Sequence, residues 1–346
     1  MGIKETLHGN GNHSTDNEPA THVVTLVEAV NLALARAMEQ DENVVVLGED
    51  VGTNGGVFRA TAGLKERFGC KRVMDTPLAE ALIAGISVGM AAQGLKPVAE
   101  IQFMGFAYAT FEHIISHAAR LRNRTRGRLH CPMVLRTPYG GGIHAPEHHC
   151  ESTEALFAHI PGLRVVVPSS PTRAYGLMLA AIEDPDPVIF LEPSRIYRMV
   201  KQEIRDDGIA LPLDTCFTLK AGTDITLISW GACVHETLQA ARELDKQGIS
   251  AEVIDVATLN PIDYATILAS VEKTGRCVII QEAVSHCSVG SEIAATLAEK
   301  GLFFLKAPVG RVNGLDIPMP YFQRENLYMP DTHEIIATAI KTMEYA

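Results

Sequence analysis

The chain has 346 residues, of which 47% are hydrophobic and 21% charged, and its net charge at pH 7 is −11. This composition is typical of a soluble globular protein, and the length exceeds one ordinary hydrophobic core, so we expect two domains. Proteins that bind nucleic-acid backbones gather lysine and arginine to displace counterions, and the acidic balance argues against such a role. The one basic run, residues 120–130, is then better explained as a helix end or a subunit contact.

The cysteines and the first twenty residues indicate the cellular compartment in which the protein is expected. The chain has 7 cysteines, an odd number, and none of them forms a C-x-x-C pair, which suits a reducing compartment. Residues 1–20 lack the apolar core of a signal peptide and are polar enough to form a disordered tail. The weakly polar run over residues 81–95 is too short and too rich in glycine for a membrane span. We therefore expect a cytoplasmic protein, of bacterial type, that does not contact a membrane.

Strand-like apolar runs alternate with helical patterns along the whole chain, which is typical of layered α/β folds. The first series predicts helices over residues 25–40, 77–93 and 111–124, and strands over 43–50, 96–103, 132–138, 164–169 and 187–193. The second series predicts strands over 224–230, 251–256, 277–282 and near Leu305, and helices over 235–248, 261–273 and 290–301. Charged and turn residues between them predict a linker over 201–222. The expected domains are residues 21–200 and 223–346.

A lone carboxylate marks the second predicted helix. Glu80 is the only charged side chain between Thr76 and Leu95. Asp75 or Thr76 can cap a helix whose first position is Pro77, which places Glu80 on the opening turn. The small residues that follow predict a helix packed closely on most sides, and burial would raise the pKa of the carboxyl and suit it to sharing a proton with a ligand. The alternative is a first-turn glutamate that only favours the helix dipole.

Two short segments match known catalytic motifs but lack the secondary structure that those motifs require. The sequence "GISVG" at residues 85–89 fits the nucleophile elbow G-x-S-x-G, but that elbow follows a strand, and here the preceding residues are helical. The sequence "HAPEH" at residues 144–148 fits an inverted zinc-protease pattern, which needs a continuous helix, but three glycines precede it and Pro146 interrupts it. Neither a hydrolase nor a zinc site is therefore predicted.

The segment "YGGGIHAPEHHCES" has the composition of an active-site loop. Three glycines at the end of a predicted strand permit backbone conformations closed to other residues, and three histidines follow within seven positions. Histidine suits proton transfer near neutral pH, so the general acid or base candidates are His144, His148 and His149. The alternative is a surface loop whose histidines only hydrogen-bond the backbone.

Together these residues identify a family. The segments "LGEDVGTNGGVFRATAGL", "RVMDTPLAEALIAGISVGMAAQGLKPVAEIQF", "GGGIHAPEHHCES" and "RVNGLDIPMPY" closely resemble the β subunit of the thiamine-diphosphate-dependent decarboxylating component of 2-oxo acid dehydrogenase complexes. The resemblance runs from about Val23 to the end of the chain. It implies a transketolase-like pyrimidine-binding domain, then a transketolase C-terminal α/β domain, and pairing with a separate α subunit in an α2β2 heterotetramer.

The resemblance also implies roles for single residues. Glu80 in "DTPLAE" matches the glutamate that hydrogen-bonds N1′ of the cofactor's aminopyrimidine and so promotes removal of the C2 proton. Phe106 is similar to the aromatic residue that stacks on the pyrimidine. His149 matches the active-site histidine near the substrate and the incoming lipoyl group, and Glu49 in "LGED" resembles the acidic residue that lines the cofactor pocket.

The family's diphosphate and Mg2+ site uses a G-D-G motif on the partner chain, and no G-D-G occurs in this sequence. We therefore expect this chain to hold half of an active site. A structural potassium ion is frequent in the family, and the residues that match its segment are Ala181, Asp184 and Asp186.

The expected reaction is oxidative decarboxylation of a 2-oxo acid with transfer of the acyl group to a lipoyl domain of the acyltransferase core. Pyruvate is the first choice, because "GGGIHAPEHH" most resembles bacterial pyruvate dehydrogenase β chains. The alternatives are a branched-chain 2-oxo acid dehydrogenase β subunit or, in a different class, a non-catalytic subunit that docks on the core. Glu80 and His149 in their family motifs argue against the last.

Overall fold

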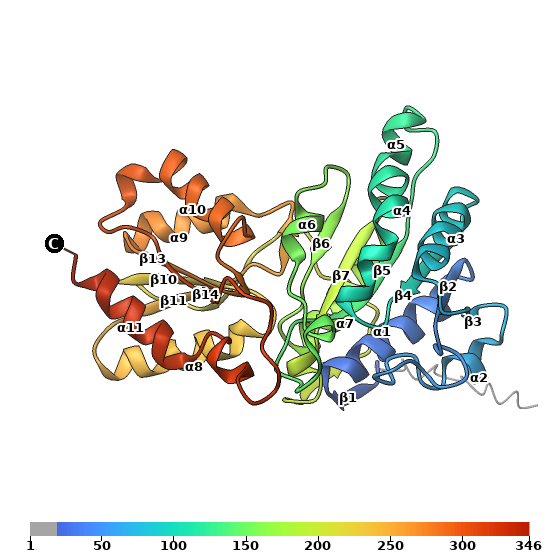
Figure 1. Ribbon diagram of the computed structural model, residues 1–346, viewed down its shortest axis with the longest axis horizontal. Helices are drawn as coiled ribbons and strands as arrows, with labels where there is room; N and C mark the ends of the chain where they lie inside the picture. The colour runs from blue at the N-terminus through green and yellow to red at the C-terminus, as the bar shows by residue number, and fades with distance from the viewer. Residues whose placement is uncertain (1–18, 346) are drawn as a thin grey trace, which may run out of the picture.

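The computed structural model describes residues 19–345, so most of the expected tail at residues 1–20 lies outside the described residues. Two α/β halves lie side by side (Figure 1). The helices are α1 (Leu26–Gln40), α2 (Leu64–Phe68), α3 (Glu80–Ala92), α4 (Phe111–Ser116), α5 (Leu121–Arg124), α6 (Glu154–Ala158), α7 (Pro171–Glu183), α8 (Cys233–Lys246), α9 (Tyr264–Thr274), α10 (Val289–Lys300) and α11 (Thr332–Met343). The strands are β1 (Thr21–Val24), β2 (Val44–Gly48), β3 (Val73–Asp75), β4 (Lys96–Glu100), β5 (Val134–Tyr139), β6 (Arg164–Val166), β7 (Val188–Pro193), β8 (Gln202–Arg205), β9 (Phe217–Lys220), β10 (Ile225–Ser229), β11 (Ala251–Asp255), β12 (Thr258–Asn260), β13 (Cys277–Val284) and β14 (Gly310–Gly314). Short 3-10 turns include η1 (Met104–Thr110), η3 (Glu147–His149) and η6 (Glu325–Leu327).

The first sheet has the order β12-β6-β7-β5-β4-β2-β3 and is parallel except for β12. Its strands are apolar runs such as "VVVLG" in β2, where every residue is buried. Parallel strands need this pattern because helices cover both faces of the sheet. The carboxyl ends of β2, β3, β4 and β5 meet at one edge, where open α/β sheets bind their ligands.

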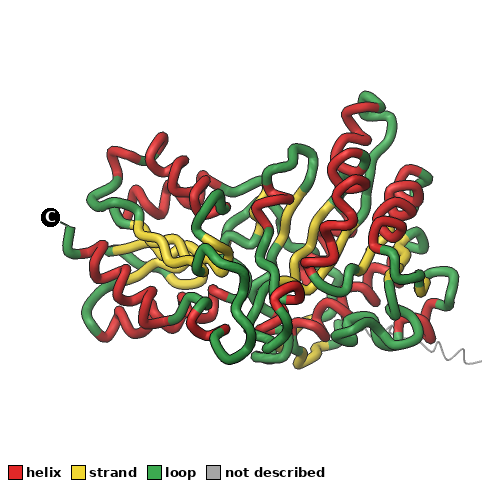
Figure 2. The backbone as a smooth tube through the Cα atoms, in the orientation of Figure 1, coloured by secondary structure: helices red, strands yellow, loops and turns green. Residues whose placement is uncertain are grey.

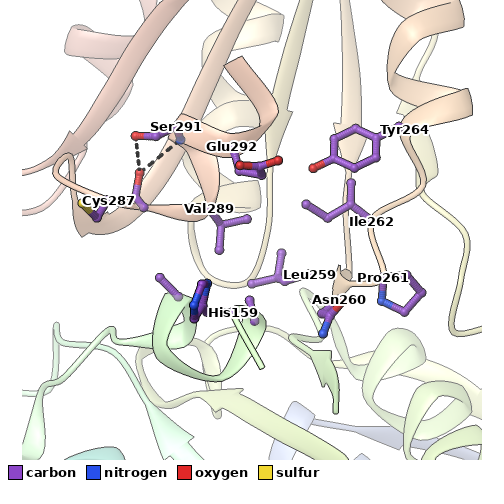
Figure 3. Close-up of a pocket in the computed structure, with 13 residues that line it drawn as sticks. His159, Leu259, Asn260, Pro261, Ile262, Tyr264, Cys287, Val289, Ser291 and Glu292 are labelled. Carbon is purple, nitrogen blue, oxygen red and sulfur yellow. Dashed lines mark hydrogen bonds between the residues drawn. The ribbon is translucent and has the colours of Figure 1, made fainter. Parts of the chain in front are cut away.

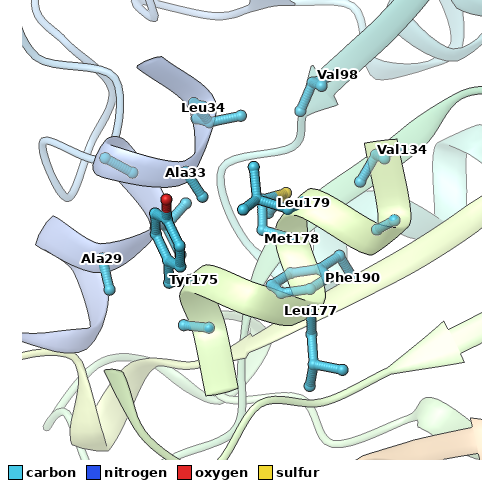
Figure 4. Close-up of a cluster of buried hydrophobic side chains, with 14 of the residues drawn as sticks. Ala29, Ala33, Leu34, Val98, Val134, Tyr175, Leu177, Met178, Leu179 and Phe190 are labelled. Carbon is cyan, nitrogen blue, oxygen red and sulfur yellow. The ribbon is translucent and has the colours of Figure 1, made fainter. Parts of the chain in front are cut away.

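Helices cover both faces of this sheet. On one face α1 and α7 pack against each other, and their side chains meet Phe190 of β7 (Figure 4). A capping box begins α1, because the backbone N–H of Thr25 donates to Glu28 Oε2 at 2.8 Å and the Glu28 side chain lies on the first turn. On the other face lie α3 and α4 (Figure 1). The carboxyl edge of the first sheet is therefore supported by a core with helices packed on both faces.

The second sheet has the order β14-β13-β10-β11-β9, in which only the edge strand β9 is antiparallel among the described strands. Helices α9 and α10 lie on one face, and α8 and α11 on the other (Figure 1). Long loops connect the two halves where they meet (Figure 2). Although β12 follows β11 in the chain, it joins the first sheet by pairing with β6.

The segment expected to be a linker, residues 201–222, contains regular structure. Strand β8 pairs antiparallel with β1, so that His22 faces Ile204, and β9 joins the second sheet beside β11. Between them Leu213 and Cys216 are buried. The connection between the halves is consequently fastened to both of them.

Three sequence predictions of elements were wrong in position. Helix α3 begins at Glu80 rather than Pro77, because the Asp75 carboxylate accepts hydrogen bonds from the N–H groups of Gly52 (2.6 Å) and Thr53 and does not cap the helix. Part of α3 is also exposed, including Leu82 at 44%. The helix predicted over 111–124 is divided by a 3-10 turn, and the strand predicted near Leu305 is β14, five residues later.

In residues 19–345 no helix is both long and apolar enough to cross a membrane. All seven cysteines are free thiols, and only Cys70 and Cys287 among them are exposed.

Candidate active site

Two carboxylates come together at the carboxyl edge of the first sheet. Glu49 directly follows β2 and is 6% exposed. Burial raises the pKa of its carboxyl, and the negative charge of Glu80 raises that pKa further. The backbone N–H of Ala79, at the start of α3, donates to Glu49 and partly offsets the effect. Sequence analysis predicted both residues for one site, and the fold places them beside each other.

The position of Glu80 follows from how α3 packs. Glu80 is the first helical residue and is half-buried. The helix packs against β4 and η1, and the small residues Ala84 and Ser87 face the core with no exposed surface. An acidic side chain on a first turn is favoured by the helix dipole. The remaining exposed side of Glu80 faces away from that core.

The second group at this edge is aromatic. Phe106 lies in η1 and His149 in η3, and their ring centroids are 5.2 Å apart in an edge-to-face arrangement. Phe103, which sequence analysis did not single out, lies between the sheet and this pair, 5.7 Å from Phe106 and 4.4 Å from His149. Phe58 extends the group through an edge contact with Phe103 at 5.6 Å. Aromatic rings in these geometries form a stable apolar wall.

The histidine loop, residues 140–152, closes on itself. The backbone N–H of Gly140 donates to the carbonyl of Glu151 at 3.0 Å, and His149 N–H donates to Pro146 at 2.9 Å. Of the three histidines, His144 and His148 are exposed, whereas His149 is half-buried against the aromatic group. The ring of His148 also lies 5.3 Å from Phe106, so burial, and not the aromatic contact alone, distinguishes His149 as the histidine enclosed by the site.

Several buried polar atoms at this edge have no hydrogen-bond partner within residues 19–345. They are Glu49 Oε1, Thr76 Oγ1 and His149 Nδ1. Buried polar groups are nearly always paired, and unpaired ones call for a missing ligand or water. A cavity of about 280 Å3 is lined by Asp50, Asn54, Gly56, Val57 and Arg59 of the loop that follows Glu49, and none of the predicted site residues lines it. The three unpaired atoms, from a carboxylate, a hydroxyl and an imidazole, fit a polar heterocycle bound beside the aromatic wall.

A buried ionic network supports this edge from the sheet side. Arg136 of β5 is 1% exposed and donates to both oxygens of Glu192, at 2.6 and 2.7 Å, and to Glu100. The Tyr197 hydroxyl donates to Glu192 at 2.5 Å. A Cβ atom on Gly56 would lie 2.8 Å from the Glu100 carboxylate, so the network also fixes the loop after β2. Burial works against the charge of Arg136, but the two carboxylates hold its pKa well above the usual value.

A larger cleft of about 740 Å3 lies elsewhere, between α6 and the second half of the chain (Figure 3). Its walls include His159, Asn260, Tyr264 and Glu292. None of the predicted site residues lines this cleft.

The residues that match a potassium segment lie at the opposite edge of the first sheet. Ala181 is buried in the last turn of α7, and Asp184 and Asp186 follow it just before β7. Both carboxylates are paired with arginines, Asp184 with Arg164 at 2.7 Å and Asp186 with Arg122 at 2.6 Å. An ion in this turn would therefore depend mainly on backbone oxygens.

The two discounted signatures have ordinary explanations. Ser87 lies inside α3, and its hydroxyl donates to the Ile83 carbonyl at 2.7 Å, a helical contact that differs from a nucleophile elbow. His144 Nδ1 lies 2.9 Å from Glu325 Oε2. Among residues 19–345, no group of three or more histidine, cysteine, aspartate or glutamate side chains could hold a metal ion.

Comparison with known proteins agrees with this architecture. The family model of the transketolase pyrimidine-binding domain matches residues 22–200, and that of the transketolase C-terminal domain matches residues 215–335. The pyruvate dehydrogenase E1 component subunit beta of Acholeplasma laidlawii is 50% identical over 91% of this chain and 96% of its own length. The protein of the same description from Bacillus subtilis (strain 168) is 45% identical over 93% of this chain and 99% of its own length.

The chain belongs to the pyruvate dehydrogenase E1 β-subunit family. The family and the enzyme class predicted from sequence are thereby confirmed. A split-gene transketolase, solved as an inactive β4 tetramer, superposes with a TM-score of 0.77 at 23% identity, covering 94% of this chain and 99% of that chain. At this identity the likeness concerns the fold, and it confirms the predicted pair of transketolase-like domains.

Proposed function

We propose that this E1 β chain forms the aminopyrimidine half of a thiamine diphosphate site that decarboxylates pyruvate and passes the acyl group to a lipoyl domain. The observation that carries the proposal is that Glu80, whose charge raises the pKa of the buried Glu49, begins a helix that packs against η1, which bears Phe106 of the aromatic wall. A carboxylate next to an aromatic wall can hold a proton on a ring nitrogen while the rings enclose the heterocycle.

Thiamine diphosphate, when bound, supplies the nucleophilic carbon and the electron sink for decarboxylation. In this proposal Glu80 hydrogen-bonds the pyrimidine N1′ and holds a proton there. Glu49, whose Oε1 has no partner in residues 19–345, lines the pocket behind it. Phe106 packs against the pyrimidine face. These residues bind and orient the cofactor and exclude water from it.

His149 serves the second half of the reaction. Its Nδ1 is buried and unpaired within the described chain, and its ring is held edge-on by Phe103 and Phe106. A histidine in such a position can give or take a proton near neutral pH. We assign it to the step in which the lipoyl sulfur accepts the acyl group.

The partner is proposed to be an α subunit that brings the diphosphate and Mg2+ motif, in an α2β2 heterotetramer that docks on the lipoyl acyltransferase core. Exposed apolar side chains adjoin the site: Leu78 at 80%, Leu82 at 44% and Val57 at 42% exposure. Apolar groups gathered beside a polar site mark an interaction surface. The absence of a G-D-G motif from the sequence makes such a partner necessary.

Three further assignments belong to the same proposal. Residues 21–200 and 223–346 are the working domains, joined by residues 201–222. A potassium ion at the turn of Ala181, Asp184 and Asp186 would brace α7 against β7 through backbone oxygens. The cytoplasm is the proposed compartment, supported by seven free thiols of which five are buried.

Calorimetric titration of thiamine diphosphate with Mg2+ tests the shared site. We expect weak binding to this chain alone and tight binding once its α partner is added, with light scattering reporting a heterotetramer. A Leu78→Lys variant should impair assembly, whereas Leu302→Lys, at an exposed leucine of the second domain, should not. Tight Mg2+-dependent binding by a monomeric β chain would defeat the proposal.

A further inference from the structure

Two buried carboxylates of the second domain reach into the histidine loop of the first. Glu282 lies near the end of β13 and is 4% exposed, and Glu325 begins η6 and is 1% exposed. A buried carboxylate is costly unless it is hydrogen-bonded. The donors to both of these carboxylates belong to the histidine loop, residues 140–152.

Glu282 closes the base of the loop with a single oxygen. Its Oε1 accepts from the Gly141 N–H at 2.6 Å and from the Ser152 hydroxyl at 2.8 Å, so the two ends of the loop meet on one atom. Gly140 has a φ of 83°, and a Cβ atom there would lie 2.6 Å from the same oxygen. A side chain at position 140 would therefore both strain the backbone and displace Glu282.

Glu325 binds residues 142–144 of the histidine loop. Its Oε1 accepts from the Gly142 N–H at 2.5 Å, and its Oε2 accepts from the His144 N–H at 3.2 Å and lies 2.9 Å from His144 Nδ1. His144 has a φ of 59°, in the left-handed region, which a non-glycine residue adopts only when its surroundings hold it there. The three contacts to Glu325 provide that restraint.

The loop is held between the two domains. On the second-domain side, Met319 and Tyr328 form a small apolar cluster with Cys150, Ile143 and Ala145 of the loop. On the first-domain side, the His148 carbonyl lies against Gly105 of η1, where a Cβ atom would lie 2.2 Å from that oxygen. The position of His149 relative to Phe106 is thus set from both sides.

We propose that Glu282 and Glu325 are positioning residues of the acyl-transfer step, which fix the histidine loop so that His149 faces the aromatic wall. The proposal rests on the assignment of His149 under the proposed function. It gives the second domain a part in the active site of its own chain, through the position of the histidine loop. The two carboxylates touch neither substrate nor cofactor and act only through the loop.

The test compares Glu282→Leu and Glu325→Gln in the assembled α2β2 enzyme. At position 325, where each oxygen accepts a donor, glutamine keeps one acceptor but places an amide where the second donor must be accommodated. At position 282, where one oxygen accepts both donors, leucine removes that acceptor. Glu252→Gln is the matched control, because Glu252 is also a second-domain carboxylate, 4% exposed, that accepts a hydrogen bond from Ser270 at 2.6 Å. Ser152→Ala, which leaves both carboxylates in place, is the milder variant should the variants at positions 282 and 325 not fold.

Amide hydrogen exchange of residues 140–152 is measured together with the two half-reactions. We expect exchange in the loop to rise about tenfold or more, acyl transfer to lipoyl to fall about tenfold, and decarboxylation with an artificial electron acceptor to fall less. Ser152→Ala should show the same pattern more weakly, and Glu252→Gln should show neither effect. The proposal would be overturned if amide exchange in residues 140–152 stays unchanged in all of these variants. It would also be overturned if exchange in β10 and β13 rises as much as exchange in the loop.

The same data separate this inference from the assignment of His149. Faster loop exchange with both half-reactions at the wild-type rate would support the restraint by Glu282 and Glu325 and overturn a role for His149 in acyl transfer. Unchanged loop exchange, combined with selective loss of acyl transfer in His149→Ala, would support His149 and overturn the restraint.

Discussion

The rings of Phe103 and His149 meet edge to face, with their centroids 4.4 Å apart, at the carboxyl edge of the first sheet. The contact leaves Nδ1 of His149 buried without a partner in residues 19–345. An imidazole that is fixed by rings, and not by hydrogen bonds, keeps its nitrogens free for proton exchange with an incoming group. This relationship motivates the first prediction.

His149→Ala should reduce acyl transfer to the lipoyl domain by about 100-fold or more, the usual contribution of a general acid or base. Decarboxylation followed with an artificial electron acceptor should fall much less, because it does not need the lipoyl acceptor. His148→Ala, at the exposed neighbour, serves as the control and should change little. An equal loss in both half-reactions would assign His149 to substrate binding instead.

Glu80→Gln should remove most turnover, by about 100-fold or more, and leave assembly intact. Glutamine keeps the volume of the side chain but cannot hold an acidic proton at the pyrimidine nitrogen. NMR of proton exchange at C2 of the cofactor in the assembled enzyme measures the affected step. Glu112→Gln is the control, since the Glu112 side chain is 74% exposed in α4. If the variant at position 80 exchanges as fast as the wild type, the assignment of Glu80 fails.

Glu154 should make stability depend on pH. It is fully buried between the domains and accepts a hydrogen bond from Trp230 Nε1 at 3.3 Å. Burial raises the pKa of Glu154 to about 7 from 4.5. Between these values the folded chain binds more protons than the unfolded chain, so the free energy of unfolding falls as pH rises, by up to about 3 kcal/mol.

Thermal unfolding at pH 5, 6, 7 and 8 measures this effect. Glu154→Gln keeps an oxygen for Trp230 and cannot ionise, so its unfolding midpoint should fall less than that of the wild type over this range. A parallel decline in the two proteins would show that Glu154 does not titrate there.

Arg136→Met should destabilise the chain by about 3–5 kcal/mol, because it leaves Glu100 and Glu192 buried without their counter-charge. Arg122→Met is the matched control. Arg122 also pairs with a carboxylate, that of Asp186, but is 52% exposed, and its loss should cost less than about 1 kcal/mol. Urea unfolding of both variants compares the two; similar small losses would mean that water reaches the Arg136 network.

Local sequence signals located much of this fold. The helical pattern of residues 25–40 predicted α1 to within a residue, and the capping box that the structure shows at Thr25 favours the same start. The start of α3 was misplaced because Asp75, a good cap by type, binds the N–H groups of the distant Gly52 and Thr53. Such long-range partners of Asp75 cannot be recognised from the residues that neighbour it in the sequence.

The residues of the site likewise divide into those that the sequence indicated and those that it did not. Motifs indicated Glu49, Glu80, Phe106 and His149, and the structure brings them to one edge, where the charge of Glu80 raises the pKa of Glu49 and the rings of Phe106 and His149 lie 5.2 Å apart. Phe103 escaped notice because an aromatic residue after a buried strand resembles ordinary core, although it stands three residues before Phe106. Glu282 and Glu325 lie more than a hundred residues from the loop that they bind, and single buried carboxylates carry no sequence pattern.

The pairing of β12 with β6 has a consequence for any attempt to separate the domains. Strand β12 comes from the second half of the chain, yet it covers the outer edge of the first sheet, and Asn260 Nδ2 also donates to the Leu163 carbonyl at 2.7 Å. A fragment that stops before residue 258 would present the bare backbone of β6 to solvent, and unprotected strand edges recruit other chains. Such a fragment should therefore aggregate through β6, even though its own helices and remaining strands are complete.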